Sequence, residues 1–268
     1  MASLCRPAAP VGARLYVIGG YDARRNSSAA VFVLRGTRWN RGPSLPIVVN
    51  HPGAAALGSD VYVAGGFTPE GATGRTFVLR TGGQCREVAP MRRARGALSL
   101  LALDGRLYAI GGRDGSREVG VTEVYDPATG RWRDTAPMPS PRNHTGGYVD
   151  GAMGCVAGGR TPATSAAIDC LDPATSTWHS DWVLPVAPSG AAAALLGGVT
   201  IVAGGEPADE SHIVGVIQES RLGVWTEIPM LVPRHGTAYA PFRERLWACG
   251  GATAPGFHAV ATCTSIGA

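Results

Sequence analysis

The chain has 268 residues, of which 45% are hydrophobic and 16% charged, and its formal net charge is +4. This composition excludes a disordered or coiled-coil chain, and the small charge gives no reason to expect a nucleic-acid partner. No run approaches 18 consecutive apolar residues, so we expect no transmembrane helix and no membrane partner.

Glycine and proline are abundant, with 38 and 20 residues. Because the glycines show no strict period of three, the excess indicates many turns between short strands, which is typical of an all-β chain. The first predicted element, within residues 2–11, aligns with the first strand of a repeat. A second strand, residues 15–18, follows it and ends at Gly19-Gly20.

A glycine pair of this kind recurs along the whole chain after a short apolar strand. The pairs are Gly19-Gly20, Gly65-Gly66, Gly111-Gly112, Gly158-Gly159, Gly204-Gly205 and Gly250-Gly251, at spacings of 46, 46, 47, 46 and 46 residues. Regular self-similarity at such a period is typical of propellers and solenoids. We therefore predict one domain over residues 1–268, with repeats at about 2–44, 45–90, 91–137, 138–183, 184–229 and 230–268.

Each repeat continues with a third strand, a turn and a fourth strand. The fourth strands carry Trp39, Trp132, Trp178 and Trp225, and in the second repeat this slot falls at Cys85. No helical periodicity is present. The pattern predicts an all-β, six-bladed β-propeller with four antiparallel strands per blade, in which the tryptophans pack between blades.

The order of residues in the third repeat also resembles a known family. Gly111-Gly112, then 125–129 (Tyr-Asp-Pro-Ala-Thr), then Trp132 and the segment 136–144 resemble the kelch repeat. This resemblance implies a kelch-type propeller. Kelch propellers include substrate-recruiting subunits of ubiquitin ligases, actin-binding proteins, sialic acid mutarotases and the catalytic domain of a copper oxidase.

The last repeat departs from this pattern, because residues 252–268 supply a third strand and no fourth. We expect a three-stranded last blade and a ring closed only by side-chain packing between the first and last blades. Such a seam would be weak unless a partner or flanking sequence completes the blade.

Since strand direction alternates within a blade, residues before each first strand and after each glycine pair should surround one mouth of the central channel. Loops held on a rigid scaffold commonly carry function. The predicted ligand-binding residues there are Tyr21, His51, Phe67, Arg95, Arg113, Arg142, His144, Arg160, Glu206, Arg234 and His235. For Arg95, Arg142 and Arg234 the alternative is a structural role, in which they bind carbonyls of a neighbouring blade.

An arginine-rich mouth with aromatic residues suits an acidic protein or peptide segment, or an anionic small molecule. The sequence holds no recognisable catalytic, nucleotide-binding or metal-binding motif, so we expect no catalytic residues, no metal and no cofactor. The leading hypothesis is a kelch-repeat binding module, with a possible use in recruiting substrates for ubiquitination. The alternative implied by the resemblance is an enzyme similar to N-acetylneuraminate mutarotases, using Glu206, His144 and Arg160.

The six cysteines are far apart in the sequence and form no C-x-x-C pair. Together with the lack of a recognisable secretory signal, this spacing favours reduced cysteines and a cytoplasmic protein.

Overall fold

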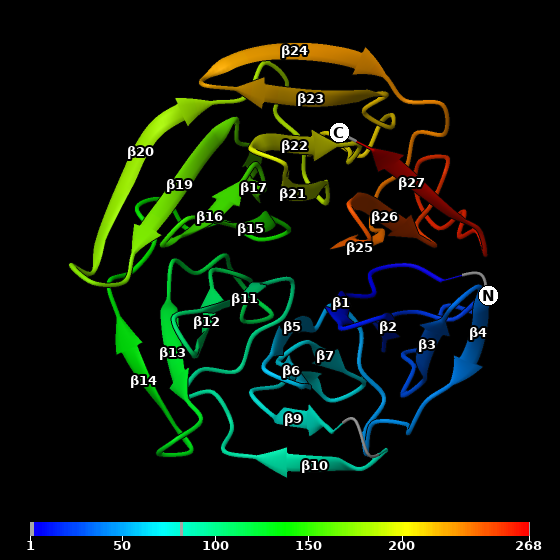
Figure 1. The fold of residues 1–268 in the computed structure, drawn as a ribbon, viewed down its shortest axis with the longest axis vertical. Helices are drawn as coiled ribbons and strands as arrows, with labels where there is room; N and C mark the ends of the chain where they lie inside the picture. Colours follow the sequence, from blue (N-terminus) through cyan, green and yellow to red (C-terminus); the bar gives the residue numbers. More distant parts are fainter. Residues whose placement is uncertain (1–2, 81–82, 268) are drawn as a thin grey trace.

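The structure is a computed structural model that describes residues 3–80 and 83–267. Six antiparallel sheets stand around a central axis like the blades of a propeller (Figure 1). All elements assigned in the described ranges are strands. These ranges contain no helix that is long and apolar enough to cross a membrane. The predicted all-β, six-bladed propeller is confirmed.

Blades 1 to 3 each contain four strands, counted from the central channel outward. Blade 1 comprises β1 (Ala8–Val11), β2 (Arg14–Ile18), β3 (Val31–Arg35) and β4 (Arg38–Arg41). Blade 2 comprises β5 (Gly53–Leu57), β6 (Asp60–Ala64), β9 (Thr76–Leu79) and β10 (Cys85–Val88). Blade 3 comprises β11 (Ser99–Leu103), β12 (Arg106–Ile110), β13 (Thr122–Asp126) and β14 (Arg131–Thr135).

Blades 4 and 5 repeat this pattern, and the last blade is shorter. Blade 4 comprises β15 (Gly146–Asp150), β16 (Met153–Ala157), β19 (Ala167–Asp172) and β20 (Thr177–Val183). Blade 5 comprises β21 (Ala192–Leu196), β22 (Val199–Ala203), β23 (Val216–Arg221) and β24 (Val224–Pro229). Blade 6 has β25 (Ala238–Phe242), β26 (Arg245–Cys249) and β27 (Cys263–Gly267), so the predicted three-stranded last blade is confirmed. Two short hairpins, β7 (Phe67–Thr68) with β8 (Gly71–Ala72) and β17 (Arg160–Thr161) with β18 (Ala163–Thr164), project from blades 2 and 4.

The glycine pairs recur because neighbouring blades approach them closely. Gly111 and Gly112 both have positive φ, 62° and 106°. A Cβ on Gly111 would lie 2.6 Å from the carbonyl oxygen of Arg142 in the next blade, and one on Gly112 would lie 2.7 Å from the carbonyl oxygen of Gly96. Only glycine tolerates both the positive φ and the close contact. The pair therefore marks the point where backbone carbonyls of other segments approach the end of each second strand.

The tryptophans of the fourth strands pack against the preceding blade, as predicted. Trp132 lies in one hydrophobic cluster with Met91 of blade 2 and Tyr125 of its own blade. Its indole nitrogen donates a 3.0 Å hydrogen bond to the carbonyl of Ala89, which follows the fourth strand of blade 2. Trp178 makes the equivalent 3.0 Å bond to Ala136. The tryptophan therefore connects blades 3 and 4 to their predecessors near the outer rim.

The ring is not closed by side-chain packing alone, and this prediction was wrong. Six residues, one before each first strand, form a continuous circle of backbone N–H···O=C bonds of 2.8–3.2 Å. They are Cys5, His51, Ala97, His144, Gly190 and Gly236, and all six have positive φ. The bond from Cys5 to Gly236 joins blades 1 and 6, so the circle of backbone bonds continues across the seam.

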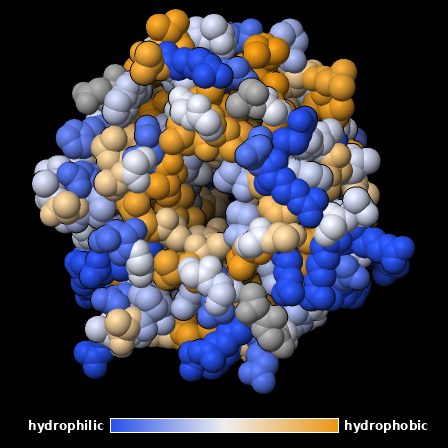
Figure 2. All heavy atoms as spheres, viewed as in Figure 1, coloured by the Kyte–Doolittle hydropathy of each residue, from blue (hydrophilic) through white to orange (hydrophobic). Residues whose placement is uncertain are grey.

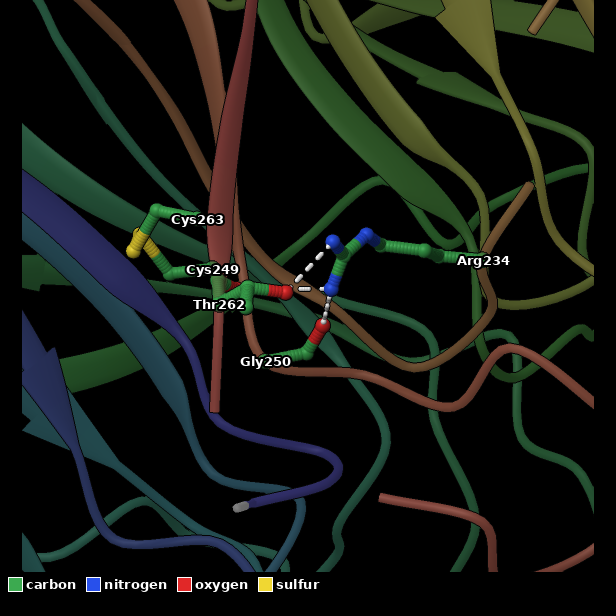
Figure 3. Close-up of a disulfide and its surroundings, with 5 residues drawn as sticks. All are labelled: Arg234, Cys249, Gly250, Thr262 and Cys263. Atoms are coloured by element: carbon green, nitrogen blue, oxygen red, sulfur yellow. Dashed lines mark hydrogen bonds between the residues drawn. A yellow bond between two sulfur atoms is a disulfide. The ribbon is translucent and has the colours of Figure 1, made fainter. Parts of the chain in front are cut away.

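The cysteines were also predicted wrongly, because four of the six form disulfides. Cys155–Cys170 joins β16 to β19, and Cys249–Cys263 joins β26 to β27 (Figure 3). In both bonds the two residues are direct cross-strand partners, with Cα atoms 4.0 and 4.1 Å apart. Cys5 and Cys85 remain thiols. Sequence spacing could not reveal these pairs, because the third strand returns to the second only once the blade is formed.

Candidate functional site

The two sets of residues predicted to share one end of the channel are brought together by paired backbone segments. Isolated antiparallel bridges join Asn50 to Phe67, Gly96 to Arg113, Asn143 to Arg160, Ser189 to Glu206 and His235 to Ala252. In each bridge, a residue before the first strand of one repeat pairs with a residue after a glycine pair. A cavity of about 800 Å³ opens between these segments, and we call it the mouth.

Eight of the eleven predicted site residues line the mouth. They are Tyr21, His51, Phe67, Arg113, His144, Arg160, Glu206 and His235. They come from all six blades. The loops at the inner end of each blade reach this cavity, whereas the third and fourth strands do not. The structure thus places them together, while their binding of a ligand stays a prediction.

The structure does not bring Arg95, Arg142 and Arg234 to the mouth. Arg95 is completely buried, and its guanidinium donates to the carbonyls of Gly111 and Ala109 and pairs with Glu123. The other two are equally enclosed: Arg142 bonds to Gly158 and Asp169, and Arg234 to Gly250 and Thr262. The predicted alternative, a structural role, describes all three, but the carbonyls belong to the arginine's own blade and not to a neighbouring one.

The mouth also contains residues that the sequence analysis missed, and they change its charge. Glu70 and Glu210 add carboxylates, and Phe257 adds an aromatic ring. All three lie a few residues beyond a glycine pair, in loops of unequal length. In the sequence, only their short distance from a glycine pair could have indicated that these three residues lie in the mouth. With two arginines and three glutamates, the mouth is not the arginine-rich mouth that was predicted.

The ion pairs of the mouth are formed by residues of blades 4 to 6. Arg160 lies 2.8 Å from the Oε1 of Glu210 and 3.8 Å from the Oε1 of Glu206. His235 Nδ1 lies 3.0 Å from the Oε2 of Glu206, and both of these side chains are buried. Burial alone would favour the neutral imidazole, but the hydrogen bond to Glu206 and its charge raise the pKa of His235. Arg113 is exposed, and its guanidinium donates a 3.5 Å hydrogen bond to the carbonyl of Ser116.

The aromatic part of the mouth is built from blades 1, 2, 4 and 6. The ring of His51 meets those of Tyr21, Phe67 and His144 edge-on, at centroid distances of 5.6, 6.0 and 5.0 Å. Phe257 contacts Tyr21 in the same way at 5.5 Å. Burial, with a smaller effect of Arg160, lowers the pKa of His51 to about 4. Burial and the neighbouring His51 also lower the pKa of His144, so both imidazoles are neutral at pH 7.

Beneath the mouth lies the central channel, a cavity of about 380 Å³ lined by the first strands. Both cavities contact the six residues of the hydrogen-bonded circle, which therefore marks the boundary between them. Figure 2 shows the hollow at the centre of one face with hydrophobic residues around it. Tyr239 reaches from blade 6 to blade 4, where its hydroxyl accepts a 2.9 Å hydrogen bond from the amide of Gly147. The alanines of β21 leave room for this ring.

In the described part of the chain no group of three histidine, cysteine or carboxylate side chains could hold a metal ion. In the mouth, the buried pair of Glu206 with His235 could donate or accept a proton, and the two arginines could neutralise an anionic group.

Comparison with known proteins agrees with the repeat. The Kelch motif family model matches residues 94–139. Kelch-like protein 33 from Homo sapiens is 32% identical over 167 residues, covering 54% of this chain and 31% of that protein. Alpha-scruin from Limulus polyphemus is 34% identical over 137 residues, covering 48% of this chain and 15% of that protein. The chain thus spans about a third or less of the length of these relatives.

A solved structure, that of YjhT, is similar to this chain over the chain's whole length. The TM-score is 0.86, and the match covers 100% of this chain and 95% of YjhT at 16% sequence identity. Such a distant likeness concerns the fold alone, and it agrees with the six-bladed arrangement.

Proposed function

Because this chain is a kelch-repeat β-propeller, we propose that it is a protein-binding module whose mouth holds an acidic segment of a partner through Arg113 and Arg160. The observation that carries the proposal is the position of these two guanidinium groups in adjacent blades, at the rim of one 800 Å³ cavity. Arginine matches the planar geometry of a carboxylate. Two arginines in adjacent blades can each bind a different acidic residue, or both can bind the same carboxylate.

The existing ion pairs do not prevent such binding. The side chain of Glu210 is 48% exposed and that of Arg160 is 21% exposed. A partly exposed pair of this kind contributes on the order of 1 kcal/mol. A carboxylate from a partner can therefore replace Glu210 at little cost, whereas the buried Glu206 stays paired with His235.

The aromatic part of the mouth adds a requirement for the partner segment. Tyr21, Phe67 and Phe257 present ring edges and faces to the same cavity as the arginines. Aromatic and apolar groups commonly supply most of the affinity of an interface, and charges supply orientation and specificity. The segment that fits best combines acidic residues with one apolar or aromatic side chain.

The test uses a fluorescein-labelled peptide of acidic residues around one phenylalanine, with its amide counterpart (Gln and Asn for Glu and Asp) as the control ligand. We expect saturable binding of the acidic peptide that weakens as salt increases. The double substitution Arg113→Glu and Arg160→Glu should weaken it at least tenfold. Arg117→Glu is the matched control, because Arg117 is 80% exposed and lies outside the mouth. Equal binding by the double variant would show that this face does not hold acidic segments.

A role in recruiting substrates for ubiquitination is a narrower form of the same proposal. It needs a second surface that engages a ligase, in addition to the mouth. Binding of the acidic peptide would support the recruiting half of this role only.

A second candidate rests on Glu206, His235 and Arg160. A carboxylate and an imidazole 3.0 Å apart, with an arginine 3.8 Å from the carboxylate, could supply the acid, base and cation for an anionic sugar such as N-acetylneuraminate. His235 suits this better than His144, whose Nδ1 is bonded to Asn143. Exchange between the anomers, followed by NMR, should be faster with the protein and slow again with Glu206→Gln. A rate equal to that in buffer eliminates this candidate.

A further inference from the structure

We propose that Arg14, Arg35 and Arg38 of blade 1 bind a phosphorylated segment of another protein, on the face of the propeller opposite the mouth. We call these three side chains the arginine row. The glycine pairs lie at the mouth and strand direction alternates, so the turns after the first and third strands lie at the other end of each blade. Arg14 follows the first of these turns in blade 1, and Arg35 and Arg38 flank the second. The site is therefore separate from the mouth.

The strand register brings the arginine row together. Arg14 of β2 is the direct partner of Arg35 of β3, which is in turn the direct partner of Arg38 of β4. Direct partners in antiparallel strands extend from the same side of the sheet, with Cβ atoms about 5 Å apart. Like charges placed in this way destabilise a sheet. The row therefore costs the blade stability unless an anion neutralises it.

The arginine row lies on the side of blade 1 that faces blade 2. Leu15, which alternates with Arg14, packs against blade 6, whereas Tyr16 packs against Val61 of blade 2. Since successive side chains of a strand point to opposite sides, Arg14 and its two partners face blade 2. Among the described residues, no carboxylate lies within ion-pair distance of the row.

The carboxylates of blades 1 and 2 are engaged elsewhere. Asp22 and Glu70 lie in loops at the mouth end. Asp60 lies 3.9 Å from an arginine of its own blade, and Glu87 lies 2.6 Å from another. The side chain of Asp60 also alternates with Val61, which packs against blade 1, so Asp60 faces blade 3. Neither blade supplies a counter-charge to the arginine row.

The equivalent row in blade 3 is neutralised within the blade. Its central residue is Asp126, which lies opposite Arg131 and 3.7 Å from Arg106. In blade 1 the central position is occupied by Arg35. Folding alone favours the alternating charges of blade 3, because opposite charges on neighbouring strands attract. The three arginines of blade 1 therefore indicate a use for the charge outside the fold.

Blade 6 adds a fourth guanidinium beside the arginine row. Arg243, in the turn between β25 and β26, donates a 3.0 Å hydrogen bond to the carbonyl of Gly36. Gly36 lies in the turn that joins Arg35 to Arg38. The residue after Arg243 is Glu244, which is exposed. Four arginines and one glutamate thus meet at this end of blades 1 and 6, which leaves an excess of positive charge.

A phosphate monoester suits the arginine row better than a carboxylate does. At neutral pH it carries a charge of about −1.5 to −2 and three acceptor oxygens, so each guanidinium can bind an oxygen of its own. Arg35 and Arg38 are exposed and Arg14 is half-buried. A free anion on such an open surface keeps most of its water. A phosphate within a protein segment is covered by the residues on either side, which strengthens its contacts with arginine.

The experiment uses a fluorescein-labelled peptide with one phosphoserine among glycine and serine residues, and the unphosphorylated peptide as the control ligand. We expect saturable binding of the phosphopeptide at low ionic strength and about tenfold weaker binding of the control. Arg38→Gln should weaken phosphopeptide binding about threefold. Arg131→Gln is the matched control, because Arg131 is exposed at the same place in blade 3 but lies opposite Asp126. It should leave binding unchanged.

A second variant, Arg35→Asp, gives blade 1 the charge pattern of blade 3. It should abolish binding of the phosphopeptide and raise the melting temperature, because two repulsive contacts become attractive. An arginine with a merely structural role would lower the melting temperature when replaced. Phosphopeptide binding that survives Arg35→Asp would overturn the proposal.

Further arms of the experiment separate the alternatives. Arg113→Glu with Arg160→Glu should leave phosphopeptide binding intact, which distinguishes the arginine row from the mouth. Equal binding of the phosphorylated and unphosphorylated peptides would overturn the assignment of a phosphate. Inorganic phosphate that binds as tightly as the phosphopeptide would overturn the assignment of a protein segment, and so would tighter binding of a single-stranded oligonucleotide.

Discussion

At the scale of single residues, one buried position between second and third strands is filled by different chemistry in successive blades. Arg95 pairs with Glu123, and Arg142 pairs with Asp169 at 2.6 Å. In blade 1 the position of these arginines is held by Ser3 and that of the carboxylate by Phe32, whose ring centroid lies 5.2 Å from the guanidinium of Arg6. Sequence reasoning could see that arginine recurs at the repeat, but not that its side chain points into the blade.

The histidines of the mouth lead to a prediction about pH. The pKa of His51 is about 4 in the folded protein because of burial, against 6.5 for an ordinary histidine. The unfolded chain therefore binds more protons between these values, and stability decreases as the pH falls from 6.5 to about 4. His51→Asn, which suits the positive φ of 50° at this position, should make the melting temperature less dependent on pH in that window.

The control for this prediction is His212→Asn, because His212 is an exposed histidine outside the mouth. It should leave the acid dependence as it is in the unchanged protein. Identical profiles for the His51→Asn variant and the unchanged protein would contradict the role of His51. His144 should contribute in the same direction, since burial lowers its pKa too.

At the scale of elements, the two disulfides lie at equivalent places in blades with different support. Cys155–Cys170 joins β16 to β19, which also pairs with β20. Cys249–Cys263 joins β26 to β27, which pairs on one edge only. Disulfides persist mainly in oxidising compartments, so these bonds weigh against the cytoplasmic location, which remains a prediction from the sequence.

Removing the second disulfide should loosen β27 selectively. With the cysteines 14 residues apart in sequence, we expect Cys249→Ala with Cys263→Ala to lower the free energy of unfolding by about 3 kcal/mol. Hydrogen exchange of the β27 amides should accelerate. The matched double variant Cys155→Ala with Cys170→Ala should accelerate exchange in β19 less, because β20 still covers that strand. Equal acceleration in the two strands would contradict this explanation.

At the scale of the whole molecule, the circle of backbone bonds makes the junction of blades 6 and 1 equivalent to the others. Gly190 and Gly236 both belong to the circle and both have positive φ, of 67° and 58°. A Cβ on Gly190 would have its nearest neighbour at 3.6 Å, whereas one on Gly236 would lie 2.8 Å from the buried Leu4 of the first blade. The two glycines therefore permit a matched test of the seam.

Gly190→Ala should lower the free energy of unfolding by about 1–2 kcal/mol, the usual cost of the left-handed conformation. Gly236→Ala should cost more, because it also displaces Leu4 from its place against blade 6. Urea unfolding measures both values. If Gly236→Ala cost no more than Gly190→Ala, the junction would not depend on the packing of Leu4.

The sequence by itself determined the repeat, the number of blades and the three strands that residues 230–268 supply. Those features follow from local requirements that recur every 46 or 47 residues, such as positive φ at the glycine pairs and the tryptophan of the fourth strand. It also located the loops of the mouth, because strand direction alternates.

Only the tertiary structure decided which arginines reach the mouth, which carboxylates accompany them, how the ring closes and which cysteines pair. Each of these depends on side-chain direction or on contacts between segments far apart in the chain. Arg142 and Arg160 are only 18 positions apart, yet one is buried inside a blade and the other lines the mouth.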